Sequence, residues 1–495
     1  MSANLSNPVT LQIYSNLPEG FYIPMPPSQP TSPALVELNT PLLESYGVSE
    51  AWFHSEDGIG FLSGNHEYQG ASPLAMAYSG HQFGHWAPVL GDGRAHMLGQ
   101  LATADGRFVD IQLKGSGRTP FSRGGDGKAT LGAVIREYLI SEAMAGLGIP
   151  TTRTLALLTT GEQIIRDFRH VPGAIQVRTA TSHLRVGSFQ YAHSRLGKDG
   201  VQALADFAIE HHFPALKDRN DRYAAFLHEV GQRQASLIVK WMLSGFIHGV
   251  MNTDNMSIVG ESIDFGPCAF MDEFKSGKVF SSIDAAGRYA WNQQAAVGYW
   301  NLQRLAETLL ELIDEDSQNA VAIAQEQVDA YIPRFQHAFR SGLKAKLGIV
   351  DETPETDDFL DSVLPLLEAE EIDFTLFFDL LTEVASGEIG NKSEEEWLSL
   401  FTQTGAGPNW LAKWQSLRSK SSSAIAAMRK ANPKLIARNH QVEQAISEAM
   451  EKDDLTLFRR LAEALRNPYA VSEQNRDLLV PPQPKERVLR TFCGT

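Results

Sequence analysis

One stretch constrains the fold of this 495-residue chain more than any other, residues 248–266, which read HGVMNTDNMSIVGESIDFG. His248 stands seven residues before Asn255, and Asp264 stands nine residues after Asn255, with the strand-like run 256–259 between them. Amide and carboxylate oxygens are hard ligands suited to Mg²⁺, and a short strand between them would set their distance. The stretch therefore predicts a site for a metal ion and phosphates.

The same spacing is typical of protein kinases, in which a catalytic loop precedes a metal-binding Asp-Phe-Gly turn. One kinase residue is missing, because the position of the catalytic Asp holds Val250, and an apolar side chain cannot accept a proton. The nearest carboxylate is Asp254, beside Asn255. The alternative interpretation is a chance loop with a structural Asp.

A lysine and a glutamate upstream extend the pattern. Strand-like runs at 97–101 and 108–114 are joined by Asp-Gly, a strong hairpin signal. A helix is expected at about 130–147, with Glu137 placed 23 residues after Lys114. An ion pair between the two would hold the ammonium of Lys114 in position to contact phosphate. The alternative interpretation is that Lys114 is a solvent-exposed residue at the end of its strand.

Glycine-rich basic loops flank this lysine. Gly91 and Gly93 would let the backbone approach a phosphate and Arg94 would add charge, although an ordinary turn fits equally well. The loop 114–128 has four cations in an acidic protein, which favours a phosphate role over a plain exposed loop. Its own candidates are Asp126 and Gly127.

Two local patterns have alternative interpretations. His81 and His85 could be metal ligands on one helical face, but nearby glycines break helices and no Glu or Cys completes the set. Residues 79–86 are therefore predicted to be packing residues. A second hairpin is expected around Thr160 and Gly161, between runs at 151–158 and 163–168.

The order of elements predicts an α+β, protein-kinase-like fold of two lobes. The N-lobe is β-rich with one αC-like helix, and the large C-lobe is mostly helical with extra C-terminal helices. Arg178 and Arg185 fall at the exit of the N-lobe, where they could grip a di- or triphosphate or be surface charges. The expected divisions are an extension wrapping the surface (1–79), the N-lobe (80–190), the C-lobe (191–466) with catalytic loop 248–255 and Asp-Phe-Gly 264–266, and a tail (467–495).

Composition limits the partners. The net charge of −16 repels nucleic acid and anionic lipid, so neither is expected as a partner. No Lys or Arg precedes Arg94 and no run of about 18 apolar residues occurs, which predicts no secretory signal, no membrane span and a cytoplasmic location. Two cysteines are too few for a disulfide framework. We expect a monomer.

Taken together, these segments resemble the selenoprotein O (YdiU) family of protein adenylyltransferases, which has a protein-kinase-like fold. The similarity runs from about residue 46 to the terminal Cys-Gly-Thr, and is most specific at 79–86, 112–137, 245–266 and Cys493. It implies that the nucleotide lies turned around relative to kinases, so that AMP passes from ATP to Ser, Thr or Tyr hydroxyls of proteins and pyrophosphate is released.

The resemblance also implies residue roles. Asp254 would accept the proton, and Asn255 and Asp264 would bind Mg²⁺ or Mn²⁺. The nucleotide would contact Gly91, Gly93, Arg94, Lys114, Asp126, Gly127, Arg178, Arg185 and Asp264. The alternatives are transfer of UMP from UTP, an atypical kinase that uses Asp254 as its base, and a nucleotide-binding scaffold without activity.

Many members of that family resemble this chain at Cys493 but carry selenocysteine there, which implies a link to redox homeostasis. We predict a reversible disulfide between Cys268 and Cys493 that closes the tail over the segment after Gly266. The alternative is two unrelated thiols, with Cys268 simply buried.

Overall fold

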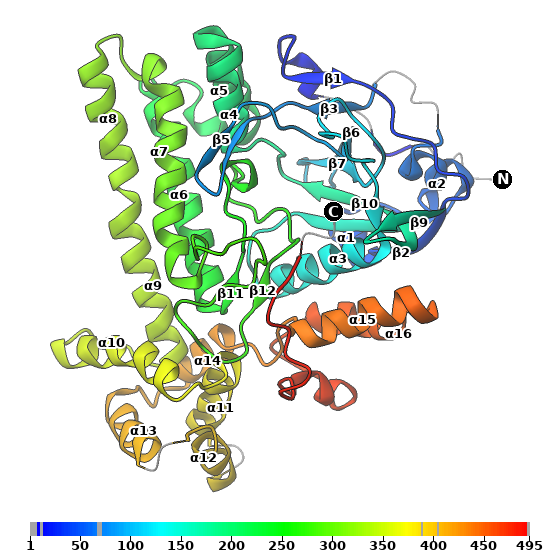
Figure 1. The fold of residues 1–495 in the computed structure, drawn as a ribbon. Coiled ribbons are helices and arrows are strands. Elements are labelled where there is room, and N and C mark those ends of the chain that lie inside the picture. Colours follow the sequence, from blue (N-terminus) through cyan, green and yellow to red (C-terminus); the bar gives the residue numbers. More distant parts are fainter. Residues whose placement is uncertain (1–6, 10–12, 67–71, 388–389, 403–404, 493–495) are drawn as a thin grey trace.

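The computed structural model describes residues 7–9, 13–66, 72–387, 390–402 and 405–492. The chain has an α+β architecture, with an antiparallel sheet beside a large set of helices (Figure 1). The strands are β1 (Tyr22–Pro24), β2 (Ala34–Leu38), β3 (Leu74–Met76), β4 (Gly80–Gln82), β5 (His85–Ala87), β6 (Ala95–Ala102), β7 (Phe108–Lys114), β8 (Ala129–Thr130), β9 (Arg153–Arg166), β10 (Arg169–Ala180), β11 (Phe246–Ile247) and β12 (Ala269–Phe270).

The main sheet has eight strands in the order β1-β3-β6-β7-β10-β9-β2, with β8 paired to β10. Three of these strands, β1, β2 and β3, come from the part of the chain before residue 80. Tyr14 from the same part is fully buried, and its hydroxyl donates a hydrogen bond to Asp110 Oδ2 at 2.6 Å. The N-terminal segment therefore supplies both edges of the sheet and some of its buried contacts.

The predicted hairpin at 97–101 and 108–114 is confirmed as β6 and β7. Side chains alternate across a strand, so Ile111 and Leu113 enter the core on one face of the sheet while Gln112 and Lys114 point to the other face. On the neighbouring strand β10, Arg178 lies opposite Gln112. The polar face thus carries a lysine and an arginine on adjacent strands.

The hairpin predicted at Thr160 and Gly161 is wrong. Strand β9 continues to Arg166, and the turn lies at Asp167 and Phe168, which have φ angles of 48° and 62°. Gly161 has φ 70°, beside an irregularity in the β9–β10 register. A glycine inside a strand pattern can mark a bulge, and here the bulge produced the signal that was interpreted as a turn.

The helices are α1 (Thr40–Tyr46), α2 (Glu56–Ser63), α3 (Leu131–Gly146), α4 (Val186–Arg195), α5 (Gly197–His212), α6 (Arg222–Leu243), α7 (Gln294–Ile313), α8 (Ser317–Asp329), α9 (Tyr331–Leu347), α10 (Pro354–Ala369), α11 (Phe374–Ser386), α12 (Asn391–Leu398), α13 (Ala406–Leu417), α14 (Ser422–Ala431), α15 (Asn439–Lys452) and α16 (Thr456–Leu465). The predicted helix at 130–147 is confirmed as α3, which begins at the N-cap Thr130. Within the described ranges, no helix is long and apolar enough to cross a membrane.

Helix α3 is covered on two sides. One side packs on β9 and β10, and α15 and α16 lie along the other (Figure 1). Arg136 on α3 donates hydrogen bonds to Asn439 at 3.2 Å and to Glu443, both on α15. The C-terminal helices therefore fix the helix that carries Glu137.

Candidate active site

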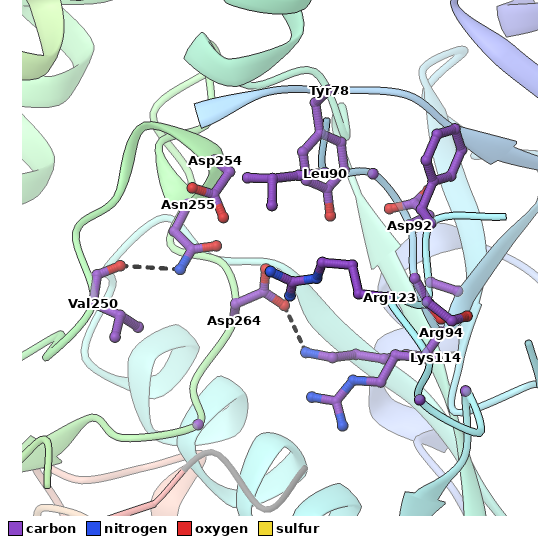
Figure 2. Close-up of a pocket in the computed structure, with 18 of the residues that line it drawn as sticks. Tyr78, Leu90, Asp92, Arg94, Lys114, Arg123, Val250, Asp254, Asn255 and Asp264 are labelled. Carbon is purple, nitrogen blue, oxygen red and sulfur yellow. Dashed lines mark hydrogen bonds and ion pairs between the residues drawn. The ribbon is translucent and has the colours of Figure 1, made fainter. Parts of the chain in front are cut away.

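A pocket of about 600 Å³ lies between the polar face of the sheet and the 250–267 segment (Figure 2). Asp254, Asn255 and Asp264 face it from the segment between α6 and α7, while Arg94, Lys114 and Arg123 come from the strand-rich part. The structure brings all the predicted nucleotide, metal and proton-accepting residues to this pocket, namely Gly91, Gly93, Arg94, Lys114, Asp126, Gly127, Arg178, Arg185, Asp254, Asn255 and Asp264, together with Glu137.

Lys114 is held between two carboxylates. Its Nζ donates to Glu137 Oε1 and to Asp264 Oδ1, each at 2.6 Å. The ion pair predicted from sequence spacing is therefore present. Since α3 carries Glu137, the position of this helix determines where the ammonium lies.

Asp264 is the centre of a cationic cluster. Besides Lys114, it accepts a hydrogen bond from Arg178 at 2.8 Å and a longer one from Arg185 at 3.4 Å. Burial by itself raises the pKa of Asp264, but the three cations outweigh burial and hold this pKa well below its usual range. Its φ of 64° is a left-handed conformation, which turns the carboxylate toward these cations.

The two arginines have further partners that the sequence did not indicate. Gln112 Oε1 accepts from Arg178 at 2.5 Å, and Asp92 Oδ1 lies 3.8 Å from Arg185. Arg185 also donates to the backbone oxygen of Asp254 at 2.9 Å. Both guanidinium groups are nearly fully buried, so these contacts fix their orientation toward the pocket.

The segment 248–266 is stabilised by its own side chains. His248 is buried, which lowers its pKa and favours a neutral ring, and its Nε2 lies 2.9 Å from the backbone oxygen of Ile263. The amide nitrogen of Asn255 donates to the backbone oxygen of Val250 at 3.0 Å (Figure 2). This bond therefore directs the amide oxygen of Asn255 away from Val250.

Asp254 has surroundings unlike those of Asp264. Its side chain is almost fully buried, and Oδ2 accepts one hydrogen bond, from Gln82 Nε2 at 3.2 Å. Oδ1 is buried and has no hydrogen-bond partner among the described residues. Burial raises the pKa of Asp254 to about 6, although Gln82 and Arg185 lower it in part. A carboxylate of this kind is a stronger base than an exposed one.

The 79–86 motif forms the β4–β5 hairpin, which covers Asp254. A β-carbon at Gly80 would lie 2.6 Å from Asp254 Oδ1, so only glycine allows this approach. His81 lies 2.8 Å from Gln190, while His85 is exposed, so the two histidines do not form a shared metal site. The prediction of packing residues fits His81, whose ring lies near those of Trp86 and Trp300, but not the exposed His85. It also missed Gln82, which contacts Asp254.

The glycine loops form one wall of the pocket. Gly91 has φ 123°, and β-carbons at Gly91 and Gly93 would clash with Phe121. Gly127 has φ 72° and packs equally tightly on Gly117. These glycines are needed for close packing of backbone at the mouth of the pocket.

The charged residues of these loops differ in their partners. Asp126 is bound by both terminal nitrogens of Arg166, at 2.8 and 2.9 Å. Arg94 and Arg123 line the pocket and make no ion pair with any residue that the structure describes. Their charges are therefore available to an anionic ligand.

The family model described as Protein adenylyltransferase SelO matches residues 7–466. This chain belongs to the SelO family. A relative from Shewanella denitrificans, named Protein nucleotidyltransferase YdiU, is 52% identical over an alignment covering 100% of this chain and 99% of the relative. Proteins of the same name from Rhizobium etli and Geobacillus kaustophilus are 48% and 47% identical, each aligned over 97% of this chain and over 96% and 98% of the relative. The family resemblance inferred from the motifs is confirmed.

As a SelO family member, the protein is a nucleotidyltransferase, and the family description implies ATP as a substrate. The residues fit a Mg²⁺ or Mn²⁺ ion bound together with nucleotide. No cluster of three or more His, Cys, Asp or Glu is found among the described residues. Mg²⁺ bound with a nucleotide needs only one or two protein oxygens besides phosphates and water, and Asn255 and Asp264, which line the pocket, would supply these.

Cys268 directly follows Gly266 and Pro267 of the pocket lining and is buried, and its Sγ lies 3.2 Å from the backbone oxygen of Phe265. Its predicted disulfide partner, Cys493, lies outside the described residues. The tail does return to this region, because Thr491 Oγ1 donates to the backbone oxygen of Pro267 at 2.6 Å. The disulfide remains a prediction.

Proposed function

We propose that this SelO protein transfers AMP from ATP to Ser, Thr or Tyr hydroxyls of protein substrates and releases pyrophosphate. The single observation that carries this proposal is the separation of two carboxylates within one pocket. Asp264 is surrounded by cations that suit a polyphosphate, while Asp254 is isolated and basic. Two carboxyl groups with opposed environments are a common mark of divided catalytic roles.

On the phosphate side, Lys114, Arg178 and Arg185 stabilise the charge that develops on the pyrophosphate leaving group. Asp264 is their shared counter-ion. The phosphates of a bound nucleotide would meet the same cations, and Asp264 and Asn255 would hold the metal ion. That ion supplies further charge neutralisation when bound.

On the acceptor side, Asp254 removes the proton from the attacking hydroxyl. The hydroxyl oxygen forms a bond to the α-phosphorus, the bond from this phosphorus to the bridging oxygen breaks, and pyrophosphate leaves with the bonding electrons. The proton goes to a carboxylate oxygen of Asp254, whose pKa of about 6 leaves it mostly ionised at pH 7. Val250 lines the pocket but offers no proton acceptor.

A protein-kinase-like arrangement of two lobes is part of the proposal, with an N-lobe at 80–190, a C-lobe at 191–466 and a tail at 467–495. The segment 1–79, expected to wrap the surface, instead adds β1, β2 and β3 to the sheet of the N-lobe. Three observations support it: the Lys114–Glu137 pair, the contact of His248 with Ile263, and the bond from Asn255 to Val250. These contacts correspond to the lysine–glutamate pair, the catalytic loop and the metal-binding turn of kinases. A monomeric, cytoplasmic protein remains our expectation.

The test uses ATP labelled with ³²P at the α or the γ position, Mg²⁺ or Mn²⁺, and a mixture of protein acceptors. We expect protein-bound label from the α position only. Label from the γ position alone would instead establish the atypical kinase, with Asp254 as its base. No label from either nucleotide, with ATP still bound, would establish the scaffold. A parallel reaction with α-labelled UTP separates UMP from AMP transfer.

A further inference from the structure

We propose that a groove next to the catalytic pocket docks an extended, acidic segment of the acceptor protein, with an apolar residue near the hydroxyl that is modified. The inference rests on the proposed transfer to proteins and specifies the acceptor that the site would select. The groove has a volume of about 890 Å³ and lies between the β4–β5 hairpin and residues 283–300. Its walls include Phe83, His85 and Trp300.

The β4–β5 hairpin contributes a residue to the groove and a residue to the catalytic pocket. Gln82 lines the pocket and binds Asp254, and the next residue, Phe83, lines the groove. The backbone nitrogen of Phe83 donates to Asn252 Oδ1 at 3.0 Å, and Tyr289 donates to the same oxygen at 2.7 Å. Asn252, two residues before Asp254, therefore joins the hairpin to Tyr289, whose neighbours Arg288 and Ala290 line the groove. A chain lying in the groove would thus lie beside the hairpin that covers the proton acceptor.

The charged side chains that line the groove are Arg288 and Asp284, and the carboxylate of Asp284 is buried. The Arg288 guanidinium stacks on the Trp300 ring at 4.7 Å, and Arg304 stacks on the same ring at 4.8 Å. Arg304 is paired with Glu307, but Arg288 makes no ion pair with any described carboxylate. The nearby Asp284 instead accepts hydrogen bonds from the backbone nitrogens of residues 288 and 289.

This cation is also held firmly in place. The terminal guanidinium atoms of Arg288 lie about 3.4 Å from where a β-carbon at Gly84 would be, so the side chain packs against the turn of the hairpin. Its Nε is buried without a hydrogen-bond partner among the described residues. The protein as a whole has a net charge of −16 and repels acidic partners. A fixed cation in the groove would therefore attract a carboxylate of a partner specifically at this place.

An exposed apolar side chain lines the same groove, because Ile283 is on the groove wall and is 64% exposed. Trp86 and Val89, on and just after the hairpin, are 42% and 44% exposed but are not among the residues that line the groove. An apolar side chain exposed this far in a groove suits contact with a partner. An extended segment presents alternate side chains to opposite sides, so one apolar and one acidic residue could meet Ile283 and Arg288 together.

The experiment measures binding separately from chemistry. Short fluorescein-labelled peptides carry a central threonine next to leucine and are flanked by either glutamates or lysines. Fluorescence anisotropy should show the acidic peptide binding about tenfold tighter than the basic peptide. Arg288→Glu should reverse this preference, and Ile283→Ser should lower the affinity for the acidic peptide several-fold. Arg476→Glu is the matched control, because Arg476 is an exposed arginine of the C-terminal segment.

Thermal unfolding and ATP affinity of each variant establish that the fold and the nucleotide site are intact, and Arg288→Gln replaces Arg288→Glu if the latter does not fold. Equal binding of both peptides by wild type and by the arginine variant would overturn the proposal. So would a change of oligomeric state caused by Ile283→Ser, because the groove would then be a contact with a second copy.

Labelling of the same peptides from α-³²P-ATP separates this proposal from the one on function. Peptides that bind through Arg288 but are never labelled would contradict the proposed adenylyl transfer, while the groove would still be supported as a peptide-binding site. Peptides that are labelled with a KM unaffected by the charge reversal would contradict the groove alone.

Discussion

Asp254 and Asp264 belong to the same short segment, yet the regions around them differ in kind. Asp264 is contacted by Lys114, Arg178 and Arg185, which hold its pKa low. Asp254 has one hydrogen bond, from Gln82, and burial raises its pKa to about 6. Identical side chains thus acquire opposite properties from their neighbours. We infer that one region handles phosphate charge and the other handles a proton.

The largest expected effect is on the cationic region. Asp264→Ala should lower AMP transfer by about 10³-fold or more, because it removes a charged metal ligand and leaves three buried cations without their shared counter-ion. Asn255→Ala, which removes only a neutral oxygen, should have a smaller effect. The measurement is transfer from α-³²P-ATP over a range of Mg²⁺ and Mn²⁺ concentrations. Wild-type activity in the Asp264 variant would refute the metal assignment.

The next effect tests the isolated region. Asp254→Ala should reduce turnover by about 10² to 10⁴-fold and leave ATP affinity nearly unchanged, as expected for a general base. Single-turnover transfer measures the rate of the chemical step, and equilibrium binding measures the affinity for ATP. If ATP affinity falls as far as turnover, the two carboxylates share one role and the contrast between them is lost.

The pH dependence should follow Asp254 rather than Asp264. The base acts only as a carboxylate, and its pKa is raised to about 6, so the rate should be level near neutral pH and fall about tenfold per unit below pH 6. The low pKa of Asp264 places its protonation outside this window. The measurement is transfer from α-³²P-ATP between pH 5 and 8 at saturating nucleotide. A rate that stays constant down to pH 5 would contradict the role of Asp254.

The smallest effect concerns stability in the nucleotide-free protein. A carboxyl whose folded pKa lies above its unfolded pKa destabilises the fold at high pH, and this cost fades as pH falls through the folded pKa. Asp254→Asn should therefore raise the free energy of unfolding by about 3 kcal/mol at pH 8, with little gain at pH 4. Asp264→Asn should lower it at pH 8. Chemical denaturation at pH 4 and pH 8 measures the free energy of unfolding of both variants. If the two substitutions changed it in the same direction at pH 8, the proposed difference between Asp254 and Asp264 would be refuted.

The sequence was sufficient for the residues whose roles depend on local spacing. The strands at β6 and β7, the helix α3 and the Lys114–Glu137 pair followed from alternation, helical periodicity and a fixed separation along the chain. Glycines were harder to interpret, because the same residue suits a turn and a bulge. That ambiguity placed the β9–β10 turn at Gly161 instead of Asp167 and Phe168.

The residues that were missed act across long separations. Gln82 reaches Asp254 over 172 positions, and Gln112 reaches Arg178 over 66. Neutral amides leave no charge or spacing pattern that would single them out. Asp92 could have been noticed as the acidic residue between Gly91 and Gly93, but nothing in the chain identifies Arg185 as its partner. Such contacts depend on how the elements meet in space.

The support of α3 by α15 has a consequence for the timing of synthesis. A ribosome completes all the pocket residues, up to Pro267, long before it makes Asn439 and Glu443, which hold Arg136 on α3. A nascent chain should therefore carry every residue of the pocket while α3 packs only on β9 and β10. We expect a product that stops before α15 to hold Glu137 less firmly and to transfer AMP more slowly than the full chain.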